Sequence, residues 1–123
     1  MSASSEPKVL THKASAAIEA NRFVKGGADN AHITKASAAS DKLIGVSMNA
    51  ATEAEQKVET ALNGGGARLK IGSGGCAFGD MLTADSDGKG IVTTTGGNRV
   101  GAMAMESGAE NDVVAVEVVT FLI

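Results

Sequence analysis

Aromatic side chains are almost absent from this sequence, whose 123 residues include three Phe and neither Trp nor Tyr. Proteins that bind single-stranded nucleic acid stack bases on aromatic rings, and cages for quaternary ammonium ligands are also aromatic. The 11 basic and 14 acidic residues give a net charge of -3, and no run of four Lys or Arg occurs. We therefore expect no nucleic-acid partner, because neutralising a phosphate backbone requires clustered cations.

Cysteine and histidine are equally scarce, with Cys76, His12 and His32 as the whole set. One cysteine cannot form an internal disulfide or a cysteine-based zinc site. A cysteine nucleophile needs a nearby base, and both histidines lie in segments that would not hold one beside Cys76. We expect no enzymatic activity, no catalytic residues, no cofactor and no metal.

Long apolar runs are missing as well. The longest, Val113 to Val116, is interrupted by Glu117 and falls far short of the roughly 20 residues of a membrane span. The first residues carry no basic segment followed by an apolar stretch, which a secretory signal requires. We expect a soluble protein, synthesised in the cytoplasm, with no membrane partner.

Small residues are abundant in this sequence, and large apolar residues are few. Gly (16) and Ala (21) make up 37 of 123 residues, whereas Leu, Ile, Val and Phe total 26. Such a composition lies near the level at which a chain buries too little apolar area to fold alone. Burial gained from neighbouring subunits compensates in many small proteins, so the composition favours an oligomer or a larger assembly.

The order of apolar patches and turns predicts strands. Residues 57–62 and 67–71 alternate apolar and polar side chains on either side of an Asn-Gly-Gly turn, which predicts a β-hairpin. Residues 1–17 are dominated by small and polar side chains, with Val9-Leu10 as the one apolar pair. We interpret residues 1–17 as an extended N-terminal arm.

Two halves of the chain are similar in pattern. The matching landmarks, 56 to 58 residues apart, are Phe23 and Met81, Ile33 and Ile91, Ile44 and Val100, and Val58 and Val114. Repeats of this length indicate duplicated supersecondary units. The prediction is a mainly all-β fold: one domain over residues 18–123, a small β-barrel or sandwich with pseudo-repeats at about 18–71 and 76–123.

Two motifs suggest ligand binding but have simpler interpretations. Residues 72–77 match the glycine pattern of a dinucleotide loop, yet the sequence that follows predicts no helix to receive a pyrophosphate. Residues 85–88, Asp-Ser-Asp-Gly, match part of a calcium loop but lack its remaining ligands. We interpret both as turns.

Several segments, in this order, are similar to those of phage head decoration proteins, also called capsid cement proteins. They are residues 20–24, 43–46, 58–62, 78–82, 100–104 and 113–119, and the resemblance extends over about residues 18–123. It implies a β-rich domain on the exterior of the phage head in the virion. Such a protein binds the major capsid protein, bridges neighbouring subunits, and forms a homotrimer or sometimes a homodimer.

Under this hypothesis, Lys8, Val9 and Leu10 are the candidate capsid-contact residues, since the arm offers a cation and two apolar anchors. Two alternatives remain open from the residues alone. One is another virion structural subunit, from the tail or baseplate. The other is a β-rich module that binds the host surface, although such modules usually display Trp or Tyr.

Overall fold

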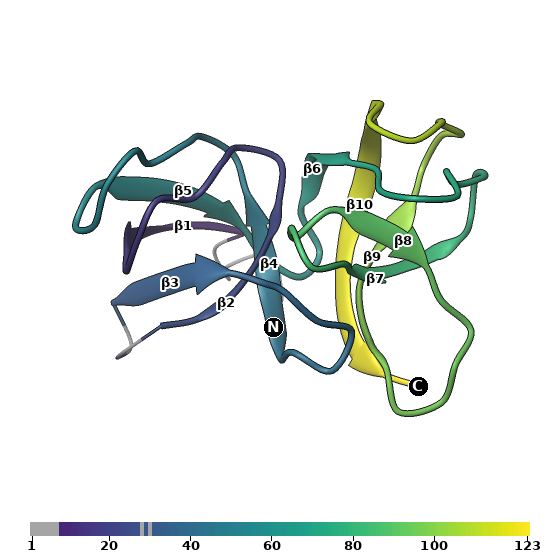
Figure 1. The fold of residues 1–123 in the computed structure, drawn as a ribbon, viewed down its shortest axis with the longest axis horizontal. Helices are drawn as coiled ribbons and strands as arrows, with labels where there is room; N and C mark the ends of the chain where they lie inside the picture. Colours follow the sequence, from purple (N-terminus) through teal and green to yellow (C-terminus); the bar gives the residue numbers. More distant parts are fainter. Residues whose placement is uncertain (1–7, 28, 30) are drawn as a thin grey trace, which may run out of the picture.

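The computed structural model describes residues 8–27, 29 and 31–123, and in these the regular structure consists of β-strands joined by turns and loops (Figure 1). This confirms the prediction of an all-β fold containing a small barrel. Within this described part, no helix is long and apolar enough to cross a membrane. The strands are β1 (Val9–Ala14), β2 (Phe23–Gly26), β3 (His32–Lys35), β4 (Leu43–Ser47), β5 (Lys57–Ala61), β6 (Gly66–Lys70), β7 (Met81–Ala84), β8 (Gly90–Val92), β9 (Arg99–Ala104) and β10 (Val113–Leu122).

The strands form two units that lie side by side in Figure 1. The first unit is a closed barrel with strand order β1-β3-β2-β4-β5, and the second is a sheet with order β6-β10-β9-β7-β8. Because the barrel is closed, its order can also be read in the other direction, as β1-β5-β4-β2-β3. When β1 is matched to β6, β2 to β7 and so on, this order is the same as that of the second sheet. The barrel closes through the parallel pair β1–β3, and the second unit has one parallel bridge, Ile71 to Gly90, at the corresponding place.

The pairing register is also duplicated. Adding 57 to each β1 residue and 56 to its β5 partner converts every β1–β5 pair into a β6–β10 pair. Adding 58 to β2 and 57 to β3 converts every β2–β3 pair into a β7–β8 pair. The positive-φ turn residues follow the same rule, with Asn21 matching Gly79 and Glu55 matching Asn111. Each unit therefore repeats one backbone plan in detail.

The expected arm is wrong for residues 9–14, which form β1 and pair with both β3 and β5 in the barrel. Residues 1–7 lie outside the described residues. The hydrophobic pattern gave no signal for this strand because only Ala14 among its residues is buried. Backbone hydrogen bonds, rather than apolar side chains, hold it in place.

The predicted hairpin of residues 57–62 and 67–71 is also wrong. A tight turn does occur, since the Gly65 amide donates to the Leu62 carbonyl at 2.8 Å. However, β5 pairs with β1 and β4, whereas β6 pairs with β10. The turn carries the chain from the first unit into the second, so the boundary between units falls at residues 62–65 and not after residue 71.

One apolar core is shared by the two units. Strand β2 directs Val24 into the barrel interior and Phe23 into this shared core, where both are fully buried. The shared core takes Phe23, Leu43 and Val46 from the first unit and Leu69, Leu82 and Val116 from the second, among others. Since each unit alone has few large apolar residues, this joint burial supplies much of the hydrophobic stabilisation.

Close packing at the shared core depends on Gly101 of β9. A Cβ atom at this position would lie 2.5 Å from Cε1 of Phe23 and 2.7 Å from Cδ1 of Leu43. Such distances are below van der Waals contact, so only glycine lets β9 approach the Phe23 ring.

We predict that Gly101→Ala destabilises the protein by about 1–3 kcal/mol, because the added methyl group overpacks the shared core. Urea unfolding of the purified chain measures this. Gly96→Ala is the matched control, since nothing lies within 4 Å of its Cβ position. Equal stability of the two variants would contradict the importance of this packing.

Candidate functional site

The sequence-predicted contact residues lie together on the surface where β1 begins. Val9 and Leu10 are 40% and 43% exposed, and Lys8 is exposed beside them. The Leu62 amide donates to the Lys8 carbonyl at 2.8 Å, so the turn between the units fixes this end of β1. We call Lys8, Val9 and Leu10 the surface patch: one cation and two half-exposed apolar side chains, which the strand directs to opposite faces.

The residues that could carry nucleophilic chemistry are not brought together. His12 lies 3.2 Å from the Thr60 hydroxyl, and His32 lies between carboxylates of Asp29 and Glu55 at 2.7 and 2.9 Å, all within the first unit. Hydrogen bonds that the His32 ring donates to those carboxylates raise the pKa of His32. Cys76 is in the second unit, with its thiol 3.7 Å from the carbonyl of Glu106.

The environment of Cys76 favours the neutral thiol. Burial raises the pKa of this thiol, and the nearby carboxylates of Asp80, Asp112 and Glu106 raise it further, although an amide hydrogen bond from Gly108 opposes them. Because the thiolate is the nucleophilic form, this environment makes Cys76 a poor nucleophile.

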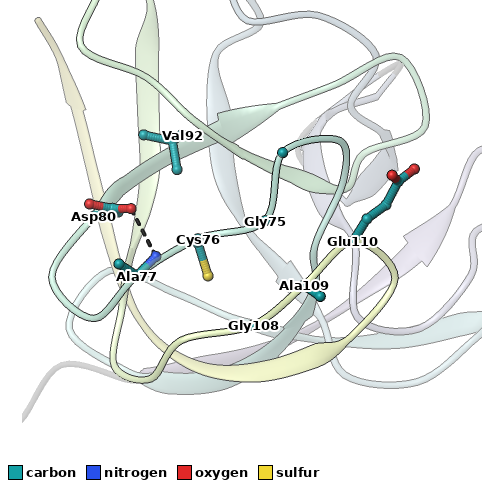
Figure 2. Close-up of a pocket in the computed structure, with 9 residues that line it drawn as sticks. Gly75, Cys76, Ala77, Asp80, Val92, Gly108, Ala109 and Glu110 are labelled. Carbon is teal, nitrogen blue, oxygen red and sulfur yellow. Dashed lines mark hydrogen bonds between the residues drawn. The ribbon is translucent and has the colours of Figure 1, made fainter.

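The glycine loop at residues 72–77 lines a cleft instead of opening a helix. Gly74 and Gly75 have φ near +91° and +68°, and Cys76 exchanges two backbone hydrogen bonds with Gly108. Figure 2 shows Asp80, Val92 and Glu110 around this open cleft of about 550 Å³. In the described residues, no three His, Cys, Asp or Glu side chains are grouped to hold a metal.

The Asp85–Gly88 motif is a turn, as interpreted from the sequence, and it contacts the first unit. Oδ1 of Asp85 accepts from the amides of Asp87 and Lys89 at 2.8 and 2.9 Å, which closes the turn. The Gly88 carbonyl accepts from the Phe23 amide at 2.8 Å. The acidic side chains of this turn therefore serve its own structure and its contact with the first unit.

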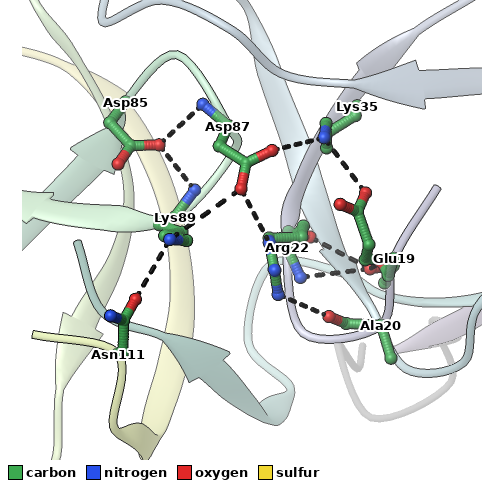
Figure 3. A network of polar contacts seen from close by, with 9 residues as sticks. Glu19, Ala20, Arg22, Lys35, Asp85, Asp87, Lys89 and Asn111 are labelled. Atoms are coloured by element: carbon green, nitrogen blue, oxygen red, sulfur yellow. Dashed lines mark hydrogen bonds and ion pairs between the residues drawn. The ribbon is translucent and has the colours of Figure 1, made fainter.

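Charged side chains from both units meet at the Asp87 carboxylate (Figure 3). Nζ of Lys35 lies 2.5 Å from one oxygen, and Nε of Arg22 and Nζ of Lys89 each lie 3.9 Å from the other. Lys35 also pairs with Glu19 at 3.0 Å. Hydrogen bonding to Lys35 lowers the pKa of Asp87 and of Glu19, and the same bond to Asp87 raises the pKa of Lys35.

Arg22 is the least exposed member of this network, at 8%. It stands where the duplicated plan places Asp80 in the second unit, and Asp80 accepts a hydrogen bond from the Ala77 amide in its own turn. In the sequence, Asn21-Arg22 stands where the second half has Gly79-Asp80. This difference between the halves could have indicated that Arg22 has a neighbour that Asp80 lacks. The sequence alone does not identify that neighbour as Asp87.

Two duplicated β units fused through a shared core define the fold class. The sequence matches no protein-family model and no curated protein. The fold is similar to a solved structure titled "The crystal structure of head fiber gp8.5 N base in bacteriophage phi29". The TM-score is 0.71 and the sequence identity 21%, over 89% of this chain and 92% of that chain. At this identity the similarity establishes a common fold over nearly the whole of both chains.

We predict that Asp87→Asn destabilises the chain by about 1–2 kcal/mol, because it leaves the buried Arg22 guanidinium without a carboxylate. The loss stays below that of a fully buried pair, since the Asp87 side chain is 42% exposed. Thermal unfolding measures the change, with Glu53→Gln at an exposed position as the control. A loss no greater than the control's would show that the network does not join the units.

The same network predicts a dependence on pH. Because Lys35 holds the pKa of Asp87 below its ordinary 3.8, the ionised carboxylate stabilises the fold above that value. The contribution is lost as pH falls through the lower, folded-state pKa. The stability difference between the native chain and Asp87→Asn should therefore shrink in acid, and unfolding measured from pH 7 to pH 2 tests it. A constant difference would contradict the assignment.

Proposed function

We propose that this protein is a structural component of a phage head, which binds the outer surface of the assembled shell and stabilises it by bridging major capsid protein subunits. The observation that carries the proposal is the fold similarity to the base of a head fibre, over 89% of this chain. The resemblance of residues 18–123 to head decoration proteins supports it independently, since it rests on motif order and not on three-dimensional shape.

A bridging role agrees with the physical character of the chain. A protein that binds only the assembled shell stabilises that shell by mass action. Many copies on a symmetric lattice make modest individual contacts sufficient, because a bridging copy engages two subunits at once. Under this proposal the protein acts without catalysis. The neutral thiol of Cys76 and its separation from both histidines support that part.

The capsid contact that we propose is the surface patch of Lys8, Val9 and Leu10. These residues are exposed, yet their backbone is fixed: Val9 and Leu10 pair with Ala61 and Thr60 of β5, and the Lys8 carbonyl accepts from the Leu62 amide. A preorganised surface loses little conformational entropy on binding. The apolar side chains would supply burial and Lys8 would supply a charge contact to an acidic shell surface.

Location in the virion is the direct test of the general proposal. Purified particles are separated into heads and tails, and each fraction is probed with antibody against this chain. The proposal expects the protein in the head fraction and on the exterior, where protease or antibody reaches it in intact particles. Recovery only with tails would support the alternative of a tail or baseplate subunit.

Deleting residues 1–17 would remove β1 from the barrel, so point variants are better tests of the contact. We predict that Leu10→Ser, combined with Lys8→Glu, weakens binding to undecorated heads by about tenfold or more with little change in stability. Co-sedimentation with heads measures the affinity.

Met48→Ser is the matched control, because Met48 is similarly exposed, at 46%, and lies outside the patch. The contact assignment fails if the Lys8 and Leu10 double variant binds heads as tightly as this control.

A further inference from the structure

The contact between the two units has a defined geometry: a turn of the second unit packs against a surface of the first. The turn of residues 85–89 places Gly88 against β2 and β3, where its Cβ position lies 2.9 Å from Cγ of Lys35. Its Asp87 carboxylate meets Lys35 and Arg22, and its Gly88 carbonyl accepts from Phe23. We call this surface, lined by Glu19, Arg22 and Lys35, the first groove.

The duplicated register identifies the corresponding surface of the second unit. Glu19, Arg22 and Lys35 correspond to Ala77, Asp80 and Val92, which lie 58, 58 and 57 residues further along. These three residues all line the 550 Å³ cleft of Figure 2. That cleft, the second groove, is therefore the second unit's copy of a surface that binds a turn. None of the described residues of this chain fills it.

The second groove is lined by acidic side chains where the first is lined mainly by basic ones. Cationic Arg22 and Lys35 are replaced by anionic Asp80 and apolar Val92, and Glu110 adds a second carboxylate to the lining. Phe78, beside the groove, is 68% exposed, the most exposed large apolar side chain in the described chain. An occupant of the second groove must therefore be a turn that carries positive charge and apolar side chains.

The first unit's equivalent turn does not meet this requirement. It connects β2 to β3 and contains Asp29, whose negative charge would face Asp80 and Glu110. The acidic turn at residues 85–89 is already bound to the first groove. Binding of the β2–β3 turn of one copy to the second groove of another copy would bring like charges together and is therefore electrostatically unfavourable.

The turn between β8 and β9 has a backbone that could enter such a groove. It is closed by a hydrogen bond from the Asn98 amide to the Thr95 carbonyl, and open space surrounds Gly96 and Gly97. Gly97 has φ near +92°, as Gly88 has +73° in the turn that fills the first groove. Both turns can therefore present their backbone closely to a partner surface.

Positive charge and apolar surface flank the β8–β9 turn. Arg99 and Lys42 line a small hollow together with Phe121, and Leu122 pairs with Arg99 in the sheet. Phe121 and Leu122 are both classed among the exposed large apolar side chains. Among the described residues, neither Arg99 nor Lys42 is in an ion pair within the chain. Their charges are available to a partner.

Val92, which lines the second groove, is the last residue of β8, so the β8–β9 turn begins beside the groove and runs from there to the end of β10 (Figure 1). The Gly108–Glu110 side of the groove adjoins the start of β10, whereas the Gly97 amide at the tip of the turn donates to the Ile123 carbonyl beyond its end. Because its tip is bonded there, the turn does not enter the groove of its own molecule. Two copies, by contrast, can join with the acidic groove of one around the basic turn of the other.

We propose that the second groove binds the β8–β9 turn of a second copy of this chain, with Arg99 against Asp80 and Glu110. The contact is head-to-tail, so successive copies form a ring if the rotation closes and an open chain if it does not. This inference does not rest on head binding, because it concerns the free chain.

Charge reversal with rescue tests the proposal by analytical ultracentrifugation over a range of protein concentration. The native chain should self-associate, more weakly at high salt.

Glu110→Lys and Arg99→Glu should each weaken association by about tenfold, and the double variant should restore it. Glu53→Lys, an exposed reversal on the first unit, is the control. Thermal unfolding checks each fold, and the neutral variants Glu110→Gln and Arg99→Gln replace any reversal that does not fold.

Cys76 provides a local readout, since it is the sole cysteine of the chain and lines the second groove. Its labelling by a maleimide should slow at least tenfold when the native chain associates, and should stay fast in Glu110→Lys at the same concentration. A native chain that sediments as a monomer at every concentration would overturn the proposal. Association that both reversals leave unchanged, or that leaves Cys76 labelling unaltered, would overturn it equally.

Discussion

Phe23 packs against Gly101, and this contact sets how closely the two units approach each other. This chain has three aromatic residues, and Phe23 is the one that is fully buried. The missing side chain of Gly101 lets the second unit approach that ring. Two small sheets, each with little to bury, thereby obtain one common core. This packing fixes the position of the two units relative to each other, and so determines which of their faces stay exposed.

Duplication supplies the scaffold, and the differences between copies supply the surfaces. The backbone registers of the two units correspond pair by pair. Side chains at equivalent positions nevertheless diverge where the copies have different neighbours. Arg22 faces a turn of the other unit, whereas its counterpart Asp80 faces an open cleft. A symmetric pair of units has thus become a molecule with unlike ends, which suits head-to-tail contacts and attachment to a shell.

The sequence predicted the fold class where burial follows the hydrophobic pattern. Val114, Val116 and Val118 alternate with more exposed residues along β10 and are buried. It failed where backbone pairing acts without such a pattern: β1 has one buried side chain, and the turn after β5 joins units instead of forming a hairpin. The ion-pair network at Asp87 was beyond reach because its members meet only after the two units pack. Lys8, Val9 and Leu10 were identified as contact candidates and are exposed in the structure, and their role stays a prediction.

A cryo-electron microscopy reconstruction of the intact particle would show whether this protein attaches to the head. We expect density for this two-unit fold on the outer surface of the shell, with the start of β1 facing a capsid subunit. Density for the fold on the tail, or a decorated head in which this chain is absent, would contradict it.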